Sequence, residues 1–117
     1  MSQKFVFHDV RTADLSASRR FYAELFGWAI TETPAGPMLG GADGVWGGFT
    51  PLAEGDPRRP QWIPYVPVAD VDSSARHAVE LGARIVKPRT DLPPGSVVVV
   101  EEPGGATLAL WQPADRK

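Results

Sequence analysis

The sequence has no cysteine, no long apolar run and no marked excess of charge of one sign. The absence of cysteine excludes disulfides, thiolate metal sites and a cysteine nucleophile. The longest aliphatic run, Val97–Val100, is far shorter than the roughly 20 residues that a membrane-spanning helix needs. With 14 acidic and 12 basic residues, the net charge is −2, and no positive field attracts nucleic acid or an anionic membrane. We therefore expect neither partner. We also expect a cytoplasmic location, because His8 and Asp9 interrupt any apolar core of a signal peptide.

The length of 117 residues predicts a single domain, residues 1–117, with an ordinary apolar fraction of 43%. Glycine and proline are abundant, with 12 residues of each. Since the apolar fraction is normal, this abundance indicates many tight turns between short strands rather than a low-complexity chain.

Two segments of the chain are similar to each other. Residues 7–15 precede a helical pattern that ends at Gly27, and residues 63–71 precede one that ends at Gly82. A shift of 56 residues aligns five identities: Val10 with Val66, Ala13 with Ala69, Asp14 with Asp70, Ser18 with Ser74, and Leu25 with Leu81. A period near half the chain length indicates a duplicated module.

Each module begins with a strand and a capped helix. Asp14 and Asp70 are expected N-caps, since their carboxylates accept hydrogen bonds from the free N–H groups of a first helical turn. The patterns predict helices over about Leu15–Phe26 and Val71–Leu81, each ended by a glycine. The residues expected to face inward are Leu15, Phe21 or Tyr22, Leu25 and Phe26 in the first helix, and Val71, Ala75, Ala78, Val79 and Leu81 in the second.

Three short strands are expected after each helix. The predicted segments are Trp28–Glu32, Met38–Gly40 and Val45–Thr50, then Ala83–Val86, Ser96–Glu101 and Thr107–Gln112. The pattern predicts an α+β fold of two tandem βαβββ modules, over about residues 4–51 and 61–113. The polar stretch of about residues 52–60 is the expected linker.

Two motifs resemble one superfamily. The segment Val10–Trp28 contains Asp14, Phe21-Tyr22 and Gly27-Trp28, and Glu102-Pro103-Gly104-Gly105 introduces the last strand. This pattern resembles the vicinal oxygen chelate superfamily, which includes glyoxalase I, bleomycin resistance proteins, extradiol dioxygenases and methylmalonyl-CoA epimerase. The resemblance implies that the modules form a curved mixed sheet around a cleft, with the helices on the outer face. It also implies a homodimer, with modules paired within one chain or between two.

Enzymes of that superfamily hold a divalent metal through His, Glu or Gln side chains from four strands. Counted from the shared motifs, the four positions in this sequence are Phe7, Trp46, Ile63 and Ala109. None of these side chains offers a lone pair suited to a divalent ion. We therefore expect no metal and no other cofactor.

The two histidines do not restore such a site. Because strand side chains alternate, His8 is expected to face the helix layer when Phe7, Asp9 and Arg11 face the cleft. His77 lies among polar residues of the second helix, where a solvated position is expected.

The same alternation predicts the lining of the cleft. The expected residues, supplied by four strands, are Phe7, Asp9, Arg11, Trp46, Ile63, Tyr65, Ala109 and Trp111. Aromatic rings with a few polar groups are typical of a small-molecule site. The alternative is that these rings fill a core and that Asp9 pairs with an arginine such as Arg11. Trp28 and Trp62 are assigned to the core or its rim.

Three functions follow as hypotheses. The first is a metal-free protein that binds a small planar or hydrophobic molecule. The second is an enzyme, either a metal-dependent lyase, epimerase or dioxygenase as the resemblance implies, or a metal-free enzyme with Asp9 as a catalytic base. The third is a homodimeric interaction module whose cleft is filled by its own side chains.

Overall fold

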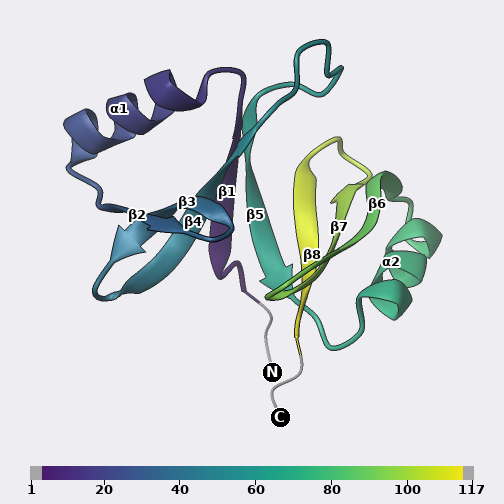
Figure 1. The fold of residues 1–117 in the computed structure, drawn as a ribbon. Helices are drawn as coiled ribbons and strands as arrows, with labels where there is room; N and C mark the ends of the chain where they lie inside the picture. Colours follow the sequence, from purple (N-terminus) through teal and green to yellow (C-terminus); the bar gives the residue numbers. More distant parts are fainter. Residues whose placement is uncertain (1–3, 115–117) are drawn as a thin grey trace. The chain divides into compact units, whose positions relative to one another are not determined.

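The computed structural model describes residues 4–114, which form eight strands and two helices (Figure 1). The chain divides into two compact units. One unit is Phe7–Ile63, and the other contains residues 4–6 and residues 64–114. The α+β class and the repeated βαβββ order are confirmed.

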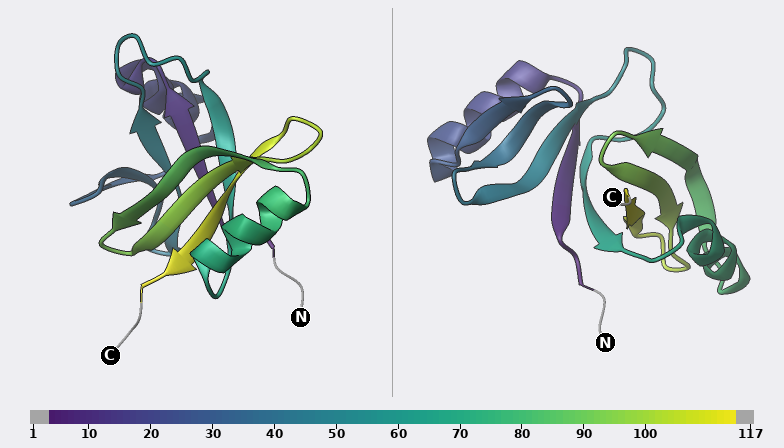
Figure 2. Two further views of the ribbon diagram at one scale, coloured as in Figure 1. Left: turned by 90° about the vertical axis from the view of Figure 1, so that its right-hand side faces the viewer. Right: turned by 60° about the horizontal axis from the view of Figure 1, so that its bottom comes forward.

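The first module contains the strands β1 (Phe7–Thr12), β2 (Ile30–Thr33), β3 (Gly36–Gly41) and β4 (Gly44–Pro51), and helix α1 (Leu15–Phe26). Its strand order is β2-β3-β4-β1. β1 runs parallel to β4, and the β2–β3 and β3–β4 pairs are antiparallel. Helix α1 lies along one face of these strands (Figure 2).

The second module repeats this plan with the strands β5 (Gln61–Pro67), β6 (Arg84–Leu92), β7 (Gly95–Glu101) and β8 (Thr107–Pro113), and helix α2 (Val71–Glu80). Its order is β6-β7-β8-β5, with β5 parallel to β8 and the other pairs antiparallel. Strand order and pairing directions are therefore the same in both modules.

The two predicted N-caps and the predicted end of α1 are confirmed. Asp14 accepts a hydrogen bond from the backbone N–H of Ala17, and Asp70 accepts one from Ser73, each over 3.0 Å. Gly27 has φ +72° and ends α1 in the left-handed conformation that glycine adopts without steric cost. The ends are set by local chemistry, which explains why the sequence predicts them.

The core of the first module lies between α1 and its sheet. Val10, Leu39 and Phe49 are buried there. Side chains packed against them are Leu15, Tyr22, Trp28, Ile30, Trp46 and Trp62. The Tyr22 ring stacks on Trp28 with 5.5 Å between ring centroids, and its hydroxyl accepts a 3.0 Å hydrogen bond from Trp62 Nε1. The core assignment of Trp28 and Trp62 is confirmed.

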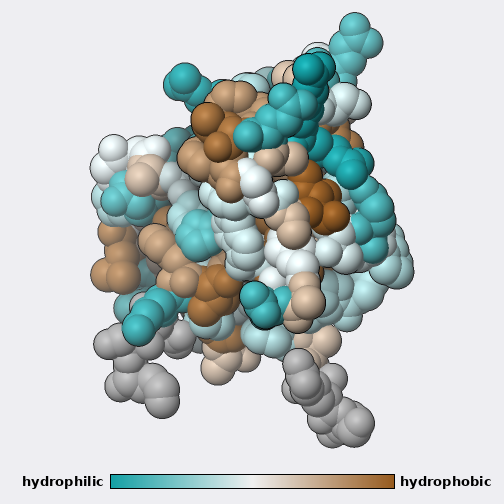
Figure 3. Space-filling model, turned by 90° about the vertical axis from the view of Figure 1, so that its left-hand side faces the viewer, coloured by the Kyte–Doolittle hydropathy of each residue, from teal (hydrophilic) through white to brown (hydrophobic). Residues whose placement is uncertain are grey.

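The inward stripe predicted for α1 is wrong in part. Leu15 and Tyr22 pack on the core, but Phe21, Leu25 and Phe26 are between 55% and 58% exposed. Leu15 and Tyr22 are seven residues apart and lie on one side of the helix, whereas Phe21 and Leu25 are rotated away from that side. Apolar side chains consequently appear at the surface in the view from the α1 side (Figure 3).

The core of the second module lies between α2 and its sheet. Its buried residues are Val71, Val98, Val100 and Leu110, with Ala75, Ile85 and other partly buried residues packed against them. Two of the residues predicted to face inward are not buried: Val79 is 49% exposed and Leu81 is 65% exposed. Leu81 follows the last helical residue, Glu80, so the helical periodicity no longer aims it at the sheet.

Strand β6 is longer than predicted. It continues past Val86 to Leu92 and includes Pro88. It is the outer strand of its four, and its pairing with β7 shifts register twice, between Ile85 and Lys87 and between Lys87 and Thr90. Proline, which lacks an N–H group, is tolerated on such an edge.

No helix within residues 4–114 has the length and apolar character needed to cross a bilayer.

Candidate functional site

Strand β1 presents two chemically different faces. Val10 lies in the core beneath α1, and the His8 ring is 6.3 Å from that of Trp46, which packs on the same core. Phe7, Asp9 and Arg11 alternate with these residues and lie on the face away from α1. The predicted orientation of His8 is confirmed.

Asp9 and Arg11 form an ion pair on that face. Arg11 Nε donates to Asp9 Oδ2 over 2.7 Å. The Arg11 side chain is 6% exposed and the Asp9 side chain is 7% exposed, so the pair is buried. The sequence leaves this pairing open as the alternative to a free Asp9. Because Arg11 already engages the carboxylate, the pair supports a binding role better than a role for Asp9 as catalytic base.

Gly48 of β4 lies beside this pair. It is the register partner of Asp9. A methyl group on Gly48 would lie 3.1 Å from Met38 Sδ, 3.2 Å from Asp9 Oδ1 and 3.3 Å from Phe7 Cζ. Three side chains therefore meet above a residue that has none, and Met38 and Phe7 lie next to Asp9 Oδ1. Neither Met38 nor Gly48 stands out in the sequence pattern.

Trp46 is not on this face, which corrects the prediction from strand alternation. Leu39 pairs with Gly47, but the next residue of β3, Gly40, pairs with Val45, so Trp46 is the extra residue of a β-bulge. A bulge changes the direction of a side chain. The Trp46 ring packs against Trp28, with 4.8 Å between centroids, and belongs to the core beneath α1.

The second module carries three of the predicted residues on one face. Tyr65 pairs with Ala109, and the rings of Tyr65 and Trp111 are 6.0 Å apart. Leu110, between Ala109 and Trp111, belongs to the core beneath α2, so its neighbours lie on the opposite side of β8. Val97 and Val99 pair with Trp111 and Ala109 and share this face. The continuous valine run of β7 already signals a strand covered on both faces.

The remaining predicted residue, Ile63, is buried at 2% exposure near the end of the first unit. The structure therefore groups Phe7, Asp9 and Arg11 in the first module and Tyr65, Ala109 and Trp111 in the second. A joint cleft formed by both groups stays a prediction.

The residues at the superfamily's metal positions do not fit a metal. Phe7, Ile63 and Ala109 present only hydrocarbon, and Trp46 is turned into a core. Residues 4–114 contain no group of three or more His, Cys, Asp or Glu side chains placed to hold an ion. His8 lies beside Trp46, and His77 is exposed on α2, 3.4 Å from Glu80. The side chains at these positions therefore support no chemical step through a metal.

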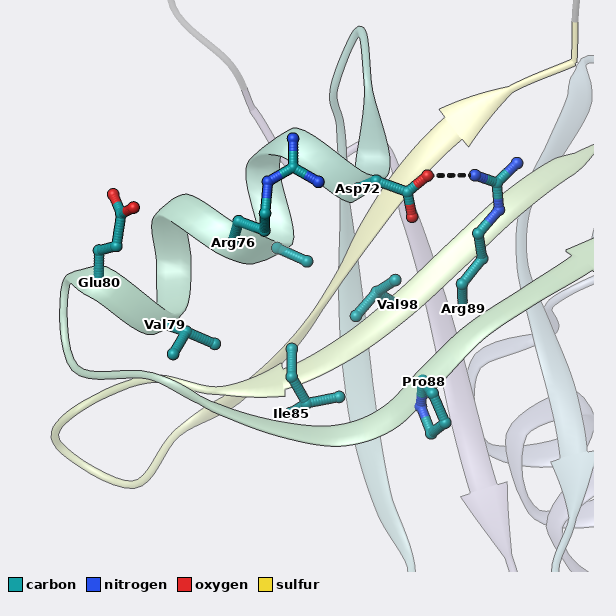
Figure 4. A pocket seen from close by; sticks show the side chains of 9 residues that line it. Asp72, Arg76, Val79, Glu80, Ile85, Pro88, Arg89 and Val98 are labelled. Carbon is teal, nitrogen blue, oxygen red and sulfur yellow. Dashed lines mark hydrogen bonds and ion pairs between the residues drawn. The ribbon is translucent and has the colours of Figure 1, made fainter.

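A groove of about 590 Å³ lies between α2 and strands β6 and β7 (Figure 4). Val79, Ile85 and Val98 line its apolar part. At its edge, Arg89 of β6 pairs with Asp72 of α2, with 2.5 Å between Arg89 Nη1 and Asp72 Oδ2. Arg76 and Glu80 of α2 also line the groove.

Arg89 also pairs with Asp91, which accepts a hydrogen bond from Ser96. The hydrogen bonds from Ser96 and then Arg89 lower the pKa of the Asp91 carboxyl, and the hydrogen bond to Asp91 raises the pKa of Arg89. A carboxyl whose pKa is lowered by folding stabilises the fold above its unfolded-state pKa, and this contribution is lost as the pH falls through the lowered value. The Asp91–Ser96 contact therefore helps to hold β6 to β7 at neutral pH, and the separate Arg89–Asp72 pair links β6 to α2.

Comparison with known proteins identifies the family. Residues 5–111 match the family described as "Glyoxalase-like domain". The chain belongs to this family. The match covers both βαβββ modules, and the resemblance seen in the sequence motifs is thereby confirmed.

Two curated relatives are much longer than this glyoxalase-like chain. "Putative glyoxylase CFP32" of Mycobacterium bovis is 32% identical in an alignment 117 positions long. This alignment covers 89% of this chain and 43% of that protein. "Anthracycline biosynthesis protein DnrV" of Streptomyces peucetius is 33% identical in an alignment 106 positions long. This alignment covers 85% of this chain and 38% of that protein. The chain thus spans about two-fifths of the length of these relatives.

Solved structures share the fold at low sequence identity. The methylmalonyl-CoA epimerase of Mycobacterium tuberculosis superposes with a TM-score of 0.62 at 20% identity, covering 95% of this chain and 88% of that one. The hypothetical protein BH1468 of Bacillus halodurans gives a TM-score of 0.67 at 12% identity, covering 100% and 99%. At these identities the likeness concerns the fold.

Proposed function

We propose that this glyoxalase-like chain binds a small planar or hydrophobic molecule without a metal ion. The observation that carries the proposal is the chemistry of the strand faces away from the helices. On these faces, hydrocarbon side chains stand where the superfamily's enzymes have metal ligands. They lie beside the buried Asp9–Arg11 pair in one module and beside the Tyr65 and Trp111 rings in the other. Aromatic surface with a few placed polar groups is typical of small-molecule sites.

Aromatic side chains favour a planar ligand. Tyr65, Trp111 and Phe7 offer ring surface on these faces, and rings gain free energy from offset stacking on other rings. The name of the Streptomyces relative concerns the biosynthesis of anthracyclines, which are planar ring systems bearing carbonyl and hydroxyl groups. We therefore propose this compound class as the first set of ligands to test.

The binding proposal is tested by titrating the protein with 1,8-dihydroxyanthraquinone while tryptophan fluorescence is recorded. We expect saturable quenching that EDTA does not change. A Trp111→Leu variant, which keeps an apolar side chain but loses the ring, should bind about tenfold more weakly, equivalent to about 1.4 kcal/mol.

Phe21→Ala provides the matched control, because Phe21 is exposed on α1 and belongs to the opposite face of its module. This variant should bind as the wild type does. Circular dichroism shows whether each variant is folded. Equal affinity of folded Trp111→Leu and wild type would remove Trp111 from the site, and quenching that requires an added metal would refute metal-free binding.

One observation favours self-association as a second candidate function. Phe21, Leu25 and Phe26 expose apolar surface on α1, and clustered exposed apolar residues are typical of interaction sites. We propose that this surface contacts a second copy of the chain. Light scattering coupled to gel filtration should then give a dimer mass for the wild type and a monomer mass for Leu25→Glu. A wild-type monomer at concentrations near 100 μM, chosen as about a hundredfold above a micromolar Kd, would contradict this.

A further inference from the structure

We infer that the Asp9–Arg11 pair recognises the lactam edge of a neutral planar heterocycle, a carbonyl group adjacent to a ring N–H. This inference rests on the proposed binding function and specifies the polar chemistry of the ligand. It depends on the first module alone, because both residues, Gly48 and Met38 belong to that unit.

The pair leaves hydrogen-bonding atoms unused. Arg11 bonds to Asp9 through Nε, and within residues 4–114 its Nη1 and Nη2 groups have no partner. Asp9 uses Oδ2 for this bond, and Oδ1 likewise has no partner in that range. Every fully buried polar side-chain atom in the described chain does have one. These free atoms therefore reach accessible space, although both side chains are more than nine-tenths buried.

The free atoms are donors on Arg11 and an acceptor on Asp9. Each Nη is two bonds from Nε, and Oδ1 is two bonds from Oδ2, so both flank the 2.7 Å bond that joins the side chains. A ligand that satisfies them must accept a hydrogen bond from Arg11 and donate one to Asp9. A lactam edge presents this pair of groups side by side in one plane.

The charge balance favours a neutral ligand. The carboxylate and the guanidinium compensate each other, so the site has no net charge to offer an anion. A bound carboxylate would bring an unpaired charge into a site that is largely removed from water, at a cost of several kcal/mol. We therefore expect discrimination against carboxylates even though an arginine is present.

The surroundings suit a flat ring. Gly48 carries no side chain, and Met38 Sδ, Phe7 Cζ and Asp9 Oδ1 meet over it, so the ring and the thioether lie next to the carboxylate oxygen. Ring edges and a polarisable sulfur make favourable contacts with an aromatic ligand. The lactam edge and the ring would thus be bound by the same small group of side chains.

Four related compounds test the inference on the wild-type protein by isothermal titration calorimetry. They are 2-quinolinone, N-methyl-2-quinolinone, quinoline and quinoline-2-carboxylate. The first has the full lactam edge, the second lacks the N–H, the third lacks both groups, and the last is an anion. We expect 2-quinolinone to bind at least tenfold more tightly than each of the others. Equal affinities, tighter binding of the carboxylate, or no binding by any of the four would overturn the inference.

The Arg11→Lys variant tests the residue itself. Lysine keeps the positive charge that Asp9 requires but lacks the planar fork of donors. We expect the preference for 2-quinolinone over quinoline to fall from at least tenfold to less than threefold. An undiminished preference in the folded variant would overturn the inference. The anthraquinone titration judges the proposed function separately, since saturable metal-independent quenching there stands whether or not the lactam preference appears.

Discussion

Replacing Asp9 with alanine is expected to lower the free energy of unfolding by about 3–5 kcal/mol. The substitution leaves the Arg11 guanidinium, 6% exposed, without its carboxylate partner. An unpaired buried charge is costly because water no longer solvates it. Urea denaturation followed by circular dichroism measures the change. A loss below about 1 kcal/mol would show that the pair is not buried as described.

Two further variants separate burial from charge pairing as the cause. The double variant Asp9→Leu with Arg11→Met removes both charges and should be close to wild type in stability, since apolar replacement of a buried ion pair is often neutral or stabilising. Glu24→Ala breaks the exposed pair of Arg20 and Glu24 on α1 and should cost less than about 0.5 kcal/mol. A double variant as unstable as Asp9→Ala would contradict the charge argument.

Replacing Gly47 with alanine is the second change for which we expect a large effect, about 3 kcal/mol of lost stability. The new methyl group would lie 2.5 Å from the carbonyl oxygen of His8 and 3.1 Å from Leu39 Cδ1. His8 is the register partner of Gly47 on β1, so strands β1 and β4 would have to move apart. Thermal and urea unfolding measure the loss.

Gly104→Ala is the matched control for this substitution. Its methyl group would come within 2.9 Å of Glu102 Oε1, which is the end of a flexible side chain rather than backbone. The side chain can turn away, and the expected change is within about 0.5 kcal/mol. Wild-type stability of Gly47→Ala, or an equal loss in both variants, would contradict the predicted close approach of β1 and β4.

Features set by local chemistry could be predicted from the sequence. The Asp14 and Asp70 caps and the left-handed Gly27 depend on a few neighbouring residues, and all three are confirmed. The duplicated βαβββ order follows from motifs that recur after 56 residues. Strand alternation also predicted which faces carry Asp9 and Arg11 in one module and Trp111 in the other.

Features set by contacts distant in the sequence could not be predicted in this way. Trp46 changes face because a bulge forms where β4 meets β3, and the register of that pairing is not visible in β4 alone. Phe21 and Leu25 fit a helical stripe, yet the packing of Tyr22 on Trp28 fixes a different side of α1 toward the sheet. The sequence likewise left open whether Asp9 was free or paired, which depends on the rotamers of two neighbouring strand residues.

The central claim is that this glyoxalase-like chain binds its ligand without a metal, and elemental analysis of the purified protein tests it most directly. The protein should be purified without chelator, then analysed for Ni, Zn, Mn and Fe before and after incubation with each ion. Since Phe7, Ile63 and Ala109 offer hydrocarbon at three metal positions and Trp46 is turned into a core at the fourth, we predict less than about 0.1 ion per chain, because a site without converging N or O donors retains no divalent ion. One tightly held ion per chain would contradict the account.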